Sequence, residues 1–203
     1  MKKILFILSL LPALIQAQEK GDYFISYNLG VIEDVYQSDL DINAYSQDMQ
    51  SDAKSDKKYG HLLAVGYHIQ EKLIIGVNYM SAEIHGANEV EYYNNSFTEK
   101  NIFIKYNLFK KGKFSLLASG SCGEVSFEGS RNFVFDDGLV NKFKDKSRKG
   151  AYGGELMYNL SDKISLNLQI MRNEIKHDGF DGWDYGSASD RYLYKSIGAR
   201  IYL

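Results

Sequence analysis

The chain has 203 residues, of which 44% are hydrophobic and 25% charged, and its formal net charge is −2. This balance excludes the strongly basic composition of nucleic-acid-binding proteins, and the length suits one domain. The single cysteine, Cys122, cannot form an internal disulfide bond, so folding does not depend on such crosslinks.

The N-terminus has the pattern of a secretory signal peptide. Two lysines precede an apolar stretch from Ile4 to Ile15, and Ala17 supplies the small residue expected before a cleavage site. We therefore expect a signal peptide at 1–17 and an exported domain at 18–203. Without those two lysines, 22 bases face 26 acids, a net charge of −4. No later segment reaches the roughly 18 apolar residues that a membrane-spanning helix needs.

Apolar and polar residues alternate along the rest of the chain with the period of two that indicates β-strands. Three similar stretches, YHIQEKL, YNLFKKGKF and YNLSDKI, predict tight hairpin turns. The other connections are long and polar, so an antiparallel up-and-down meander of eight strands is expected. Its apolar rows cover 22–31, 59–69, 73–79, 102–108, 114–118, 152–160, 164–170 and 196–203, and its long loops are 32–57, 86–96, 128–149 and 176–190.

The polar faces of these strands indicate which side lines the interior. Their residues are mostly Gly, Ser, Ala and Asn, as expected where space is short, and eight strands enclose just enough room for side chains. Six glycines fall on these faces: Gly30, Gly66, Gly76, Gly123, Gly153 and Gly198. We expect this face to line a crowded lumen and the apolar face to meet a bilayer. The alternative is a soluble lipocalin-like carrier that holds an apolar ligand inside.

Tyrosines support the bilayer interpretation. Tyr67, Tyr106 and Tyr158 occupy equivalent outward positions just above the tight turns, and Tyr59 and Tyr152 lie nearer the other end of their strands. The spacing predicts an apolar band of roughly 20–25 Å between two aromatic girdles.

These features together resemble the small outer-membrane barrels of the OmpA/OmpX type. The resemblance covers Asp22–Leu203 and depends on architecture rather than on a motif, so it transfers no functional residue; the family's usual last residue is aromatic, whereas here it is Leu203. It implies an all-β, eight-stranded antiparallel up-and-down transmembrane β-barrel with short periplasmic turns and long extracellular loops. It also implies an integral protein of the outer membrane, monomeric, in contact with outer-membrane lipid and lipopolysaccharide.

Three charged residues share the lumen face a few residues above the tight turns: Lys105, Glu155 and Arg200. Because charges in a sealed lumen must be paired, we expect a charge network that plugs the barrel. A gated ion path is the alternative.

Three outward bases are candidates for lipopolysaccharide contacts. Lys100, Arg172 and Lys195 each lie eight residues from the outward residue at the periplasmic boundary of their strand, so they are expected near the upper interface. Contact with anionic lipid groups is worth about 1 kcal/mol per base. Simple snorkelling to water is the alternative.

The third long loop contains FVFDDGLVNKF at 133–143, with strand-forming residues on both sides of an Asp-Gly turn. It predicts a stiff hairpin beyond the membrane whose unpaired edges bind an extended partner by strand addition. The candidate partner-binding residues are Phe133, Phe135, Lys142 and Lys144. The alternative is a loop ordered only by contact between its bases and the acidic first loop, Glu33–Lys57.

No catalytic, metal or cofactor site is expected. His61, His68, His85 and His177 have no His-x-Ser pair or strand-borne nucleophile beside them in the sequence. The three aspartates of DGFDGWD, Asp178–Asp184, lack the EF-hand pattern. We therefore expect a non-enzymatic barrel whose loops serve envelope integrity, adhesion or defence. A lipid A-modifying enzyme of the outer leaflet is the alternative.

Overall fold

The computed structural model describes residues 23–37, 54–56, 58–87, 91–133, 140–176, 180 and 189–203. Among them there is no helix long and apolar enough to cross a membrane. The expected signal peptide at 1–17 lies outside the described residues. The strands are β1 (Tyr23–Gln37), β2 (Lys54–Asp56), β3 (Lys58–Gln70), β4 (Leu73–Ala87), β5 (Glu91–Lys111), β6 (Phe114–Phe133), β7 (Val140–Asn159), β8 (Ile164–Ile175) and β9 (Asp190–Tyr202).

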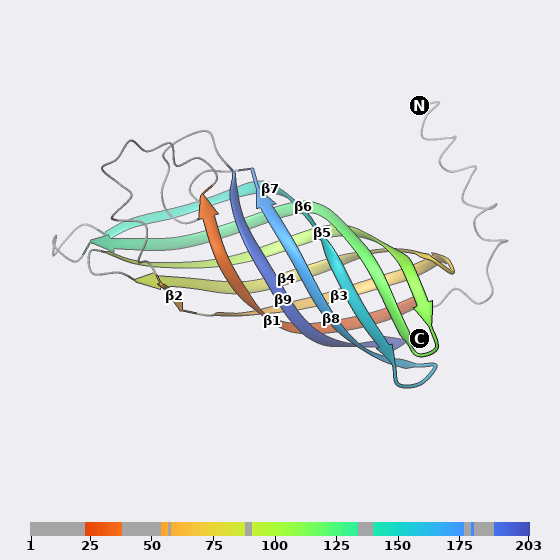
Figure 1. Cartoon of the computed structure of the whole chain (residues 1–203). Coiled ribbons are helices and arrows are strands. Elements are labelled where there is room, and N and C mark those ends of the chain that lie inside the picture. The colour runs from red at the N-terminus through yellow and green to blue at the C-terminus, as the bar shows by residue number, and fades with distance from the viewer. Residues whose placement is uncertain are drawn as a thin grey trace, which may run out of the picture.

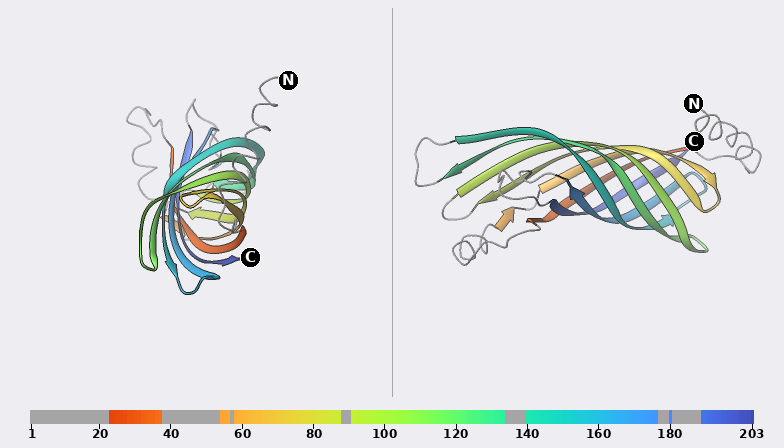
Figure 2. Two further views of the ribbon diagram at one scale, coloured as in Figure 1. Left: turned by 90° about the vertical axis from the view of Figure 1, so that its right-hand side faces the viewer. Right: turned by 90° about the horizontal axis from the view of Figure 1, so that it is seen from above.

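The strands form one closed antiparallel barrel. Neighbouring strands follow the order β2-β4-β3-β1-β9-β8-β7-β6-β5, and a further pairing of β4 with β5 closes the sheet. The short β2 pairs with the outer end of β4 and directly precedes β3, so these two segments form one of the eight barrel strands. Figures 1 and 2 show the closed, tilted barrel. The eight-stranded up-and-down fold expected from the alternation is confirmed.

Three tight turns lie at one end of the barrel, and each joins two neighbouring strands into a hairpin. Residues 71–72, 112–113 and 160–163 make these turns, and the last residue lies at the same end, where the Leu203 N–H donates to the Tyr23 carbonyl at 2.9 Å (Figure 1). Gly112 has a φ of 58°, a left-handed conformation that favours glycine. The strand before it runs three residues beyond the predicted Leu108, with a register shift between Asn107 and Phe109.

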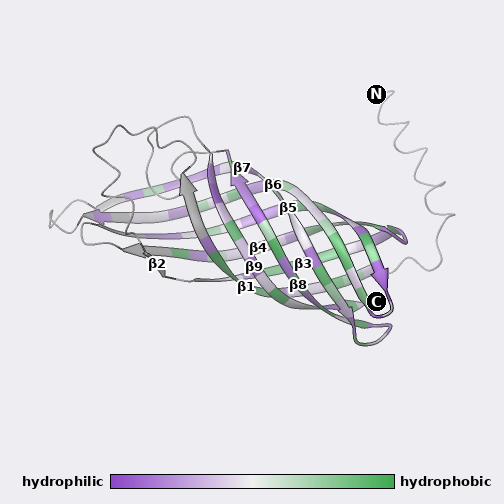
Figure 3. Cartoon of the chain, in the orientation of Figure 1, coloured by the Kyte–Doolittle hydropathy of each residue, from purple (hydrophilic) through white to green (hydrophobic). Residues whose placement is uncertain are grey.

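The outer surface of the barrel is apolar on all eight barrel strands. Ile102, Leu168 and Ile197, for example, are 66%, 53% and 60% exposed. Figure 3 shows this hydrophobic zone across the part of the barrel near the tight turns. Rings pair at that end, Tyr23 with Tyr67 at 4.6 Å between centroids. A soluble carrier cannot expose such a surface to water, so the lipocalin-like alternative is wrong.

Strands replace two of the predicted loops. The segments expected as loops at 86–96 and 128–149 instead lie largely within β4, β5, β6 and β7, which extend beyond β8 and β9 (Figures 1 and 2). The predicted loops are therefore wrong there, although the predicted hairpin at 133–143 agrees with strands paired up to Asn132 and Val140. The outward apolar row stops in these segments, but the alternation continues with its polarity reversed.

The lumen contains two apolar clusters as well as polar residues. The cluster near the tight turns comprises Phe24, Ala64, Ile74, Phe103, Leu117 and Met157. The other lies towards the long end and includes Phe97, Val125, Phe127, Phe180 and Tyr192. The sequence predicted a lumen lined mostly by small and amide side chains, but the observed lumen is more apolar. The reason is that inward-facing aromatic residues of the extended strands fill its outer half.

Glycine is required where the wall packs closely. An added Cβ on Gly153 would overlap the carbonyl of Ile170, and the other five predicted lumen glycines would meet similar overlaps. Gly154, which follows Gly153 in the chain, faces outward. A Cβ added to Gly154 would lie 3.6 Å from the Leu117 carbonyl oxygen, an ordinary packing distance.

We therefore predict opposite outcomes for two adjacent substitutions. Gly153→Val should lower the free energy of unfolding by about 3 kcal/mol or prevent folding, because the backbone it meets cannot move aside. Gly154→Val should fold as well as the wild type, since its side chain enters open space. The folded fraction in unboiled samples on SDS gels measures both, and equal folding of the two variants would contradict the inward placement of Gly153.

Candidate functional site

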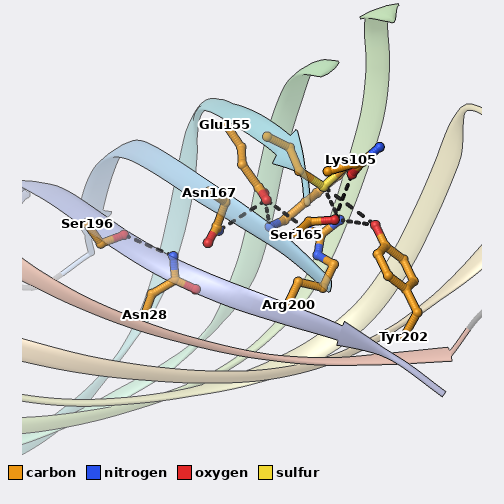
Figure 4. Close-up of polar contacts among 10 residues, drawn as sticks. Asn28, Lys105, Glu155, Ser165, Asn167, Ser196, Arg200 and Tyr202 are labelled. Atoms are coloured by element: carbon orange, nitrogen blue, oxygen red, sulfur yellow. Dashed lines mark hydrogen bonds and ion pairs between the residues drawn. The ribbon is translucent and has the colours of Figure 1, made fainter. Parts of the chain in front are cut away.

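The predicted lumen charge network is assembled in the half of the barrel near the tight turns. Lys105 of β5, Glu155 of β7 and Arg200 of β9 point into the lumen and meet there (Figure 4). One Glu155 oxygen accepts from Arg200 Nη2 at 2.6 Å and from Asn167 Nδ2 at 3.2 Å, and the other is paired with Lys105. The Arg200 guanidinium also lies 4.1 Å from the centre of the Phe24 ring. The structure thus brings together all three residues that the sequence grouped.

This network links three strands of the barrel wall through buried charges. The Glu155 and Arg200 side chains are fully buried, and one carboxylate balances two cations. Removing the carboxylate would leave two buried cations without compensation, which is the costly case for buried ion pairs.

A second buried network lies farther from the tight turns and was missed by the sequence analysis. Lys149 of β7 forms an ion pair with Glu99 of β5 and donates to Asn173 Oδ1 at 2.6 Å and to the Tyr192 hydroxyl at 3.2 Å. The Tyr192 hydroxyl donates in turn to Glu99. The sequence did contain a signal for this network. Lys149 and Glu155 lie an even number of positions apart in one strand, so they share its inward face.

Aromatic rings close the lumen beyond this second network. Phe180, from the segment between β8 and β9, inserts among the rings of Phe97 and Phe127, with centroid distances of 5.0 and 5.3 Å. The Phe180 N–H donates to the Asp190 carboxylate at 2.7 Å, and its carbonyl accepts from Asn95. The Phe180 ring is thus packed against other rings inside the barrel, and both of its backbone groups are hydrogen-bonded.

Little space remains between the two networks. The lumen cavity there has a volume of about 30 Å³ and is lined by residues that include Asn28, Asn101 and Lys105. A cavity of that size holds one or two water molecules. Along the described part of the lumen, side chains are therefore packed in three layers: the first ion-pair network, the second ion-pair network and the aromatic cluster around Phe180.

The extended part of β7 has a basic outer face. Its alternate outward residues, Lys142, Lys144, Lys146 and Arg148, are all exposed. Across the ladder, Glu128 binds Lys144 at 2.8 Å and Glu124 lies 3.8 Å from Lys146. The Lys144 ammonium lowers the pKa of Glu128, and Glu128 in turn raises the pKa of Lys144. Of the other candidates, Phe133 is the last residue of β6 and Phe135 lies outside the described residues.

The edges of this hairpin differ from the prediction. We expected both edges to be unpaired, but β6 is paired with β5 as far as Phe133 opposite Glu91, so that expectation is wrong for β6. The outer edge of β7 pairs with β8 only from Lys149 onward, and in the described part of the chain no strand covers it from Val140 to Arg148. The Lys146 N–H is occupied by the Asp145 carboxylate at 2.6 Å.

The three predicted lipid-contacting bases lie outward at the top of the apolar rows of β5, β8 and β9. Lys195 forms an ion pair with Glu33 of β1, and Arg172 Nε lies 3.9 Å from Glu174. Lys100 is exposed and has no ion pair among the described residues. Their contact with lipopolysaccharide remains a prediction.

The two histidine side chains that the structure describes both contact aromatic residues. His61 Nδ1 is hydrogen-bonded to the Tyr27 hydroxyl at 2.7 Å on the outer surface, and the His68 ring packs near Phe24 and Tyr202. The side chain of His85 and all of His177 lie outside the description, as do the aspartates of 178–184. Among the described residues, no group of three or more His, Cys, Asp or Glu residues could hold a metal ion.

Comparisons with known proteins agree on the architecture. The model of the outer membrane protein beta-barrel domain family matches residues 4–195. No curated protein matches the sequence. Neisserial surface protein A is 12% identical, with 90% of this chain and 99% of that chain covered and a TM-score of 0.57. A major outer membrane protein from Thermus thermophilus is 11% identical, with 89% and 99% covered and a TM-score of 0.53. The outer membrane protease OmpT from Escherichia coli is 9% identical, with 90% and 96% covered and a TM-score of 0.48. At these identities, the likeness to the first two structures concerns the fold, and none of the three assigns an activity.

The geometry of the first network gives a stability prediction. Glu155→Ala should lower the free energy of unfolding by about 3–5 kcal/mol, because Lys105 and Arg200 would remain buried without a counter-charge. Urea unfolding in lipid vesicles measures it. Glu128→Ala removes a carboxylate of the same kind from an exposed pair and should leave the midpoint unchanged. An unchanged midpoint for Glu155→Ala would mean that water reaches this network.

Proposed function

This chain belongs to the outer membrane protein beta-barrel domain family, and from that premise we propose that it is a non-enzymatic, non-conducting surface protein. It is exported by its signal peptide, resides in the outer membrane as a monomer, and binds acidic extended partners through the strands that project beyond the bilayer. Of the roles expected for its surface, adhesion fits this chemistry best.

The observation that carries the proposal is the outer edge of β7 between Val140 and Arg148, which no described strand covers. The Arg148 carbonyl accepts from the Lys176 N–H on the β8 side, at 2.9 Å. Because backbone groups alternate in direction along an antiparallel strand, those of Lys142 and Lys144 point to this same side. An extended segment can pair with them by strand addition while its acidic side chains meet the lysines.

The supporting strands make this edge rigid before binding. β5, β6 and β7 are hydrogen-bonded to one another along the projecting part, and Phe127 and Phe143 pack beneath it at 6.4 Å between centroids. A rigid edge loses little conformational entropy when a partner binds, which favours affinity.

The non-conducting and non-enzymatic parts of the proposal are supported by the lumen and by the histidines. Two buried ion-pair networks and the Phe180 plug obstruct the lumen in series. Of the described histidines, His61 is hydrogen-bonded to the Tyr27 hydroxyl on the outer surface, and the His68 ring packs near Phe24 and Tyr202, which supports a structural role for both.

We predict no ion conduction in planar lipid bilayers. The wild type should give no single-channel steps, and neither should Phe97→Ala combined with Phe180→Ala, because the charge networks still block the lumen below the plug. A general porin in the same bilayer serves as the positive control. Stable steps from the wild type would contradict a permanently blocked lumen.

We also predict that a proline at position 144 weakens partner binding. Lys144→Pro removes one edge N–H that faces away from β6, a change that edge strands tolerate. It should weaken binding of a synthetic peptide of alternating Glu and Thr about five-fold more than Lys144→Gln, which removes only the charge. Fluorescence anisotropy with the reconstituted barrel measures the affinity.

Two controls define this test. Asp145→Pro removes an N–H directed towards β6 and should disrupt the hairpin itself, seen as faster amide exchange across β6 and β7. A peptide of alternating Lys and Thr should not bind the wild type. Equal affinities of Lys144→Pro and Lys144→Gln would show that the edge is not the binding surface.

A further inference from the structure

A groove crosses the outer surface of the barrel from β3 to β7. Its apolar floor is one row of outward residues that stand opposite one another on successive strands. Val77 faces Ile102, Ile102 faces Cys122, and Cys122 faces Gly150. The groove exists because the row ends in two small residues: a Cβ on Gly150 would meet nothing within 4 Å, and Cys122 is exposed.

Charged residues form the upper rim of the groove, one step farther from the tight turns. Lys100 stands opposite Glu124 and Glu124 opposite Arg148, while Lys176 continues the row, its N–H bonded to the Arg148 carbonyl. Glu124 is already close to Lys146, at 3.8 Å. Within the described residues, Lys100, Arg148 and Lys176 have no ion pair, so three bases share this rim and its one acid has another partner.

We propose that this groove is a binding site for lipopolysaccharide, with phosphate groups between Lys100, Arg148 and Lys176 and one acyl chain over Gly150 and Cys122. The site suits an anionic amphiphile because its basic rim can bind the anionic head group and its apolar floor can bind the acyl chain. The two parts adjoin at the boundary of the apolar band. Water at this level competes less well for the phosphate than it does for a fully exposed ion pair, because the floor is apolar.

The position of the groove specifies the lipid. It lies at the end of the apolar band remote from the short turns, which is the outer-leaflet side in barrels of this kind. Its outermost bases lie on strands separated by two inter-strand spacings or more, roughly 10 Å, which suits two phosphate groups better than one. The site depends on placement in the outer membrane and not on the proposed partner at the β7 edge.

Charge removal tests the rim. Native mass spectrometry of the detergent-solubilised barrel should show binding of bisphosphorylated lipid A. Lys100→Gln, Arg148→Gln and Lys176→Gln combined should weaken it about ten-fold or more. The matched control, Lys110→Gln, Lys111→Gln and Lys113→Gln combined, removes the same charge near the tight turn between β5 and β6 and should leave binding unchanged. Equal losses in the two triple variants would reduce the effect to net charge and overturn the site.

Filling the groove tests its floor without altering charge. Gly150→Leu should weaken lipid A binding, whereas Gly154→Leu, on the same face of the same strand but outside the groove, should not. A heat-shift gel shows that each variant is folded. Unchanged binding by Gly150→Leu would overturn the acyl-chain assignment. Phosphatidylglycerol bound as tightly as lipid A, with the same sensitivity to the rim variants, would overturn the choice of lipopolysaccharide.

Discussion

Inside a bilayer no water is present to satisfy the backbone groups of a strand at a sheet edge, so a sheet that crosses the bilayer must close. Here the closing ladder is that of β4 with β5, from Leu73 opposite Tyr106 to Ala87 opposite Tyr92. Closure around eight strands limits the interior to the width of side chains. This narrow width has two consequences in the described part of the barrel. Glycine is needed where a side chain would overlap the neighbouring strand, and a charged side chain in the lumen needs an oppositely charged partner.

Along their length the strands pass from the lipid bilayer into water. Near the tight turns they present apolar residues to lipid and hold polar residues inside, whereas farther out β7 presents Lys144 to water and turns Phe143 inward. The outer half is thus organised as a soluble barrel would be, with an aromatic core that includes Phe127 and Phe180. This core joins the projecting parts of β5, β6 and β7 through their inward-facing side chains.

The structure could be predicted from the sequence wherever the alternating pattern places apolar residues outside and polar residues inside. The barrel, the tight turns and the grouping of Lys105, Glu155 and Arg200 could all be deduced from position along a strand. Apart from the hairpin predicted at 133–143, the projecting strands were taken for loops because outward apolar residues were used to define strands. Above the membrane the apolar residues point inward. Lys149 and Arg148 were lost for that reason, and with them the second network and part of the basic rim. Phe180 could not have been found, because its place in the lumen depends on a non-repeating segment.

The basic outer face of β7 also bears on how the barrel enters the membrane. An exported chain reaches the bilayer from the side of the tight turns, so the four bases between Lys142 and Arg148 must cross the hydrocarbon. Each costs about 2–4 kcal/mol at the midplane, so the four bases crossing together on β7 alone would meet a barrier on the order of 10 kcal/mol. Glu128 beside Lys144 and Glu124 near Lys146 offset part of that cost if β6 and β7 cross as a hairpin that is already paired. Pairing of β6 with β7 before insertion thus lowers the barrier that this hairpin meets, and a thicker bilayer raises it.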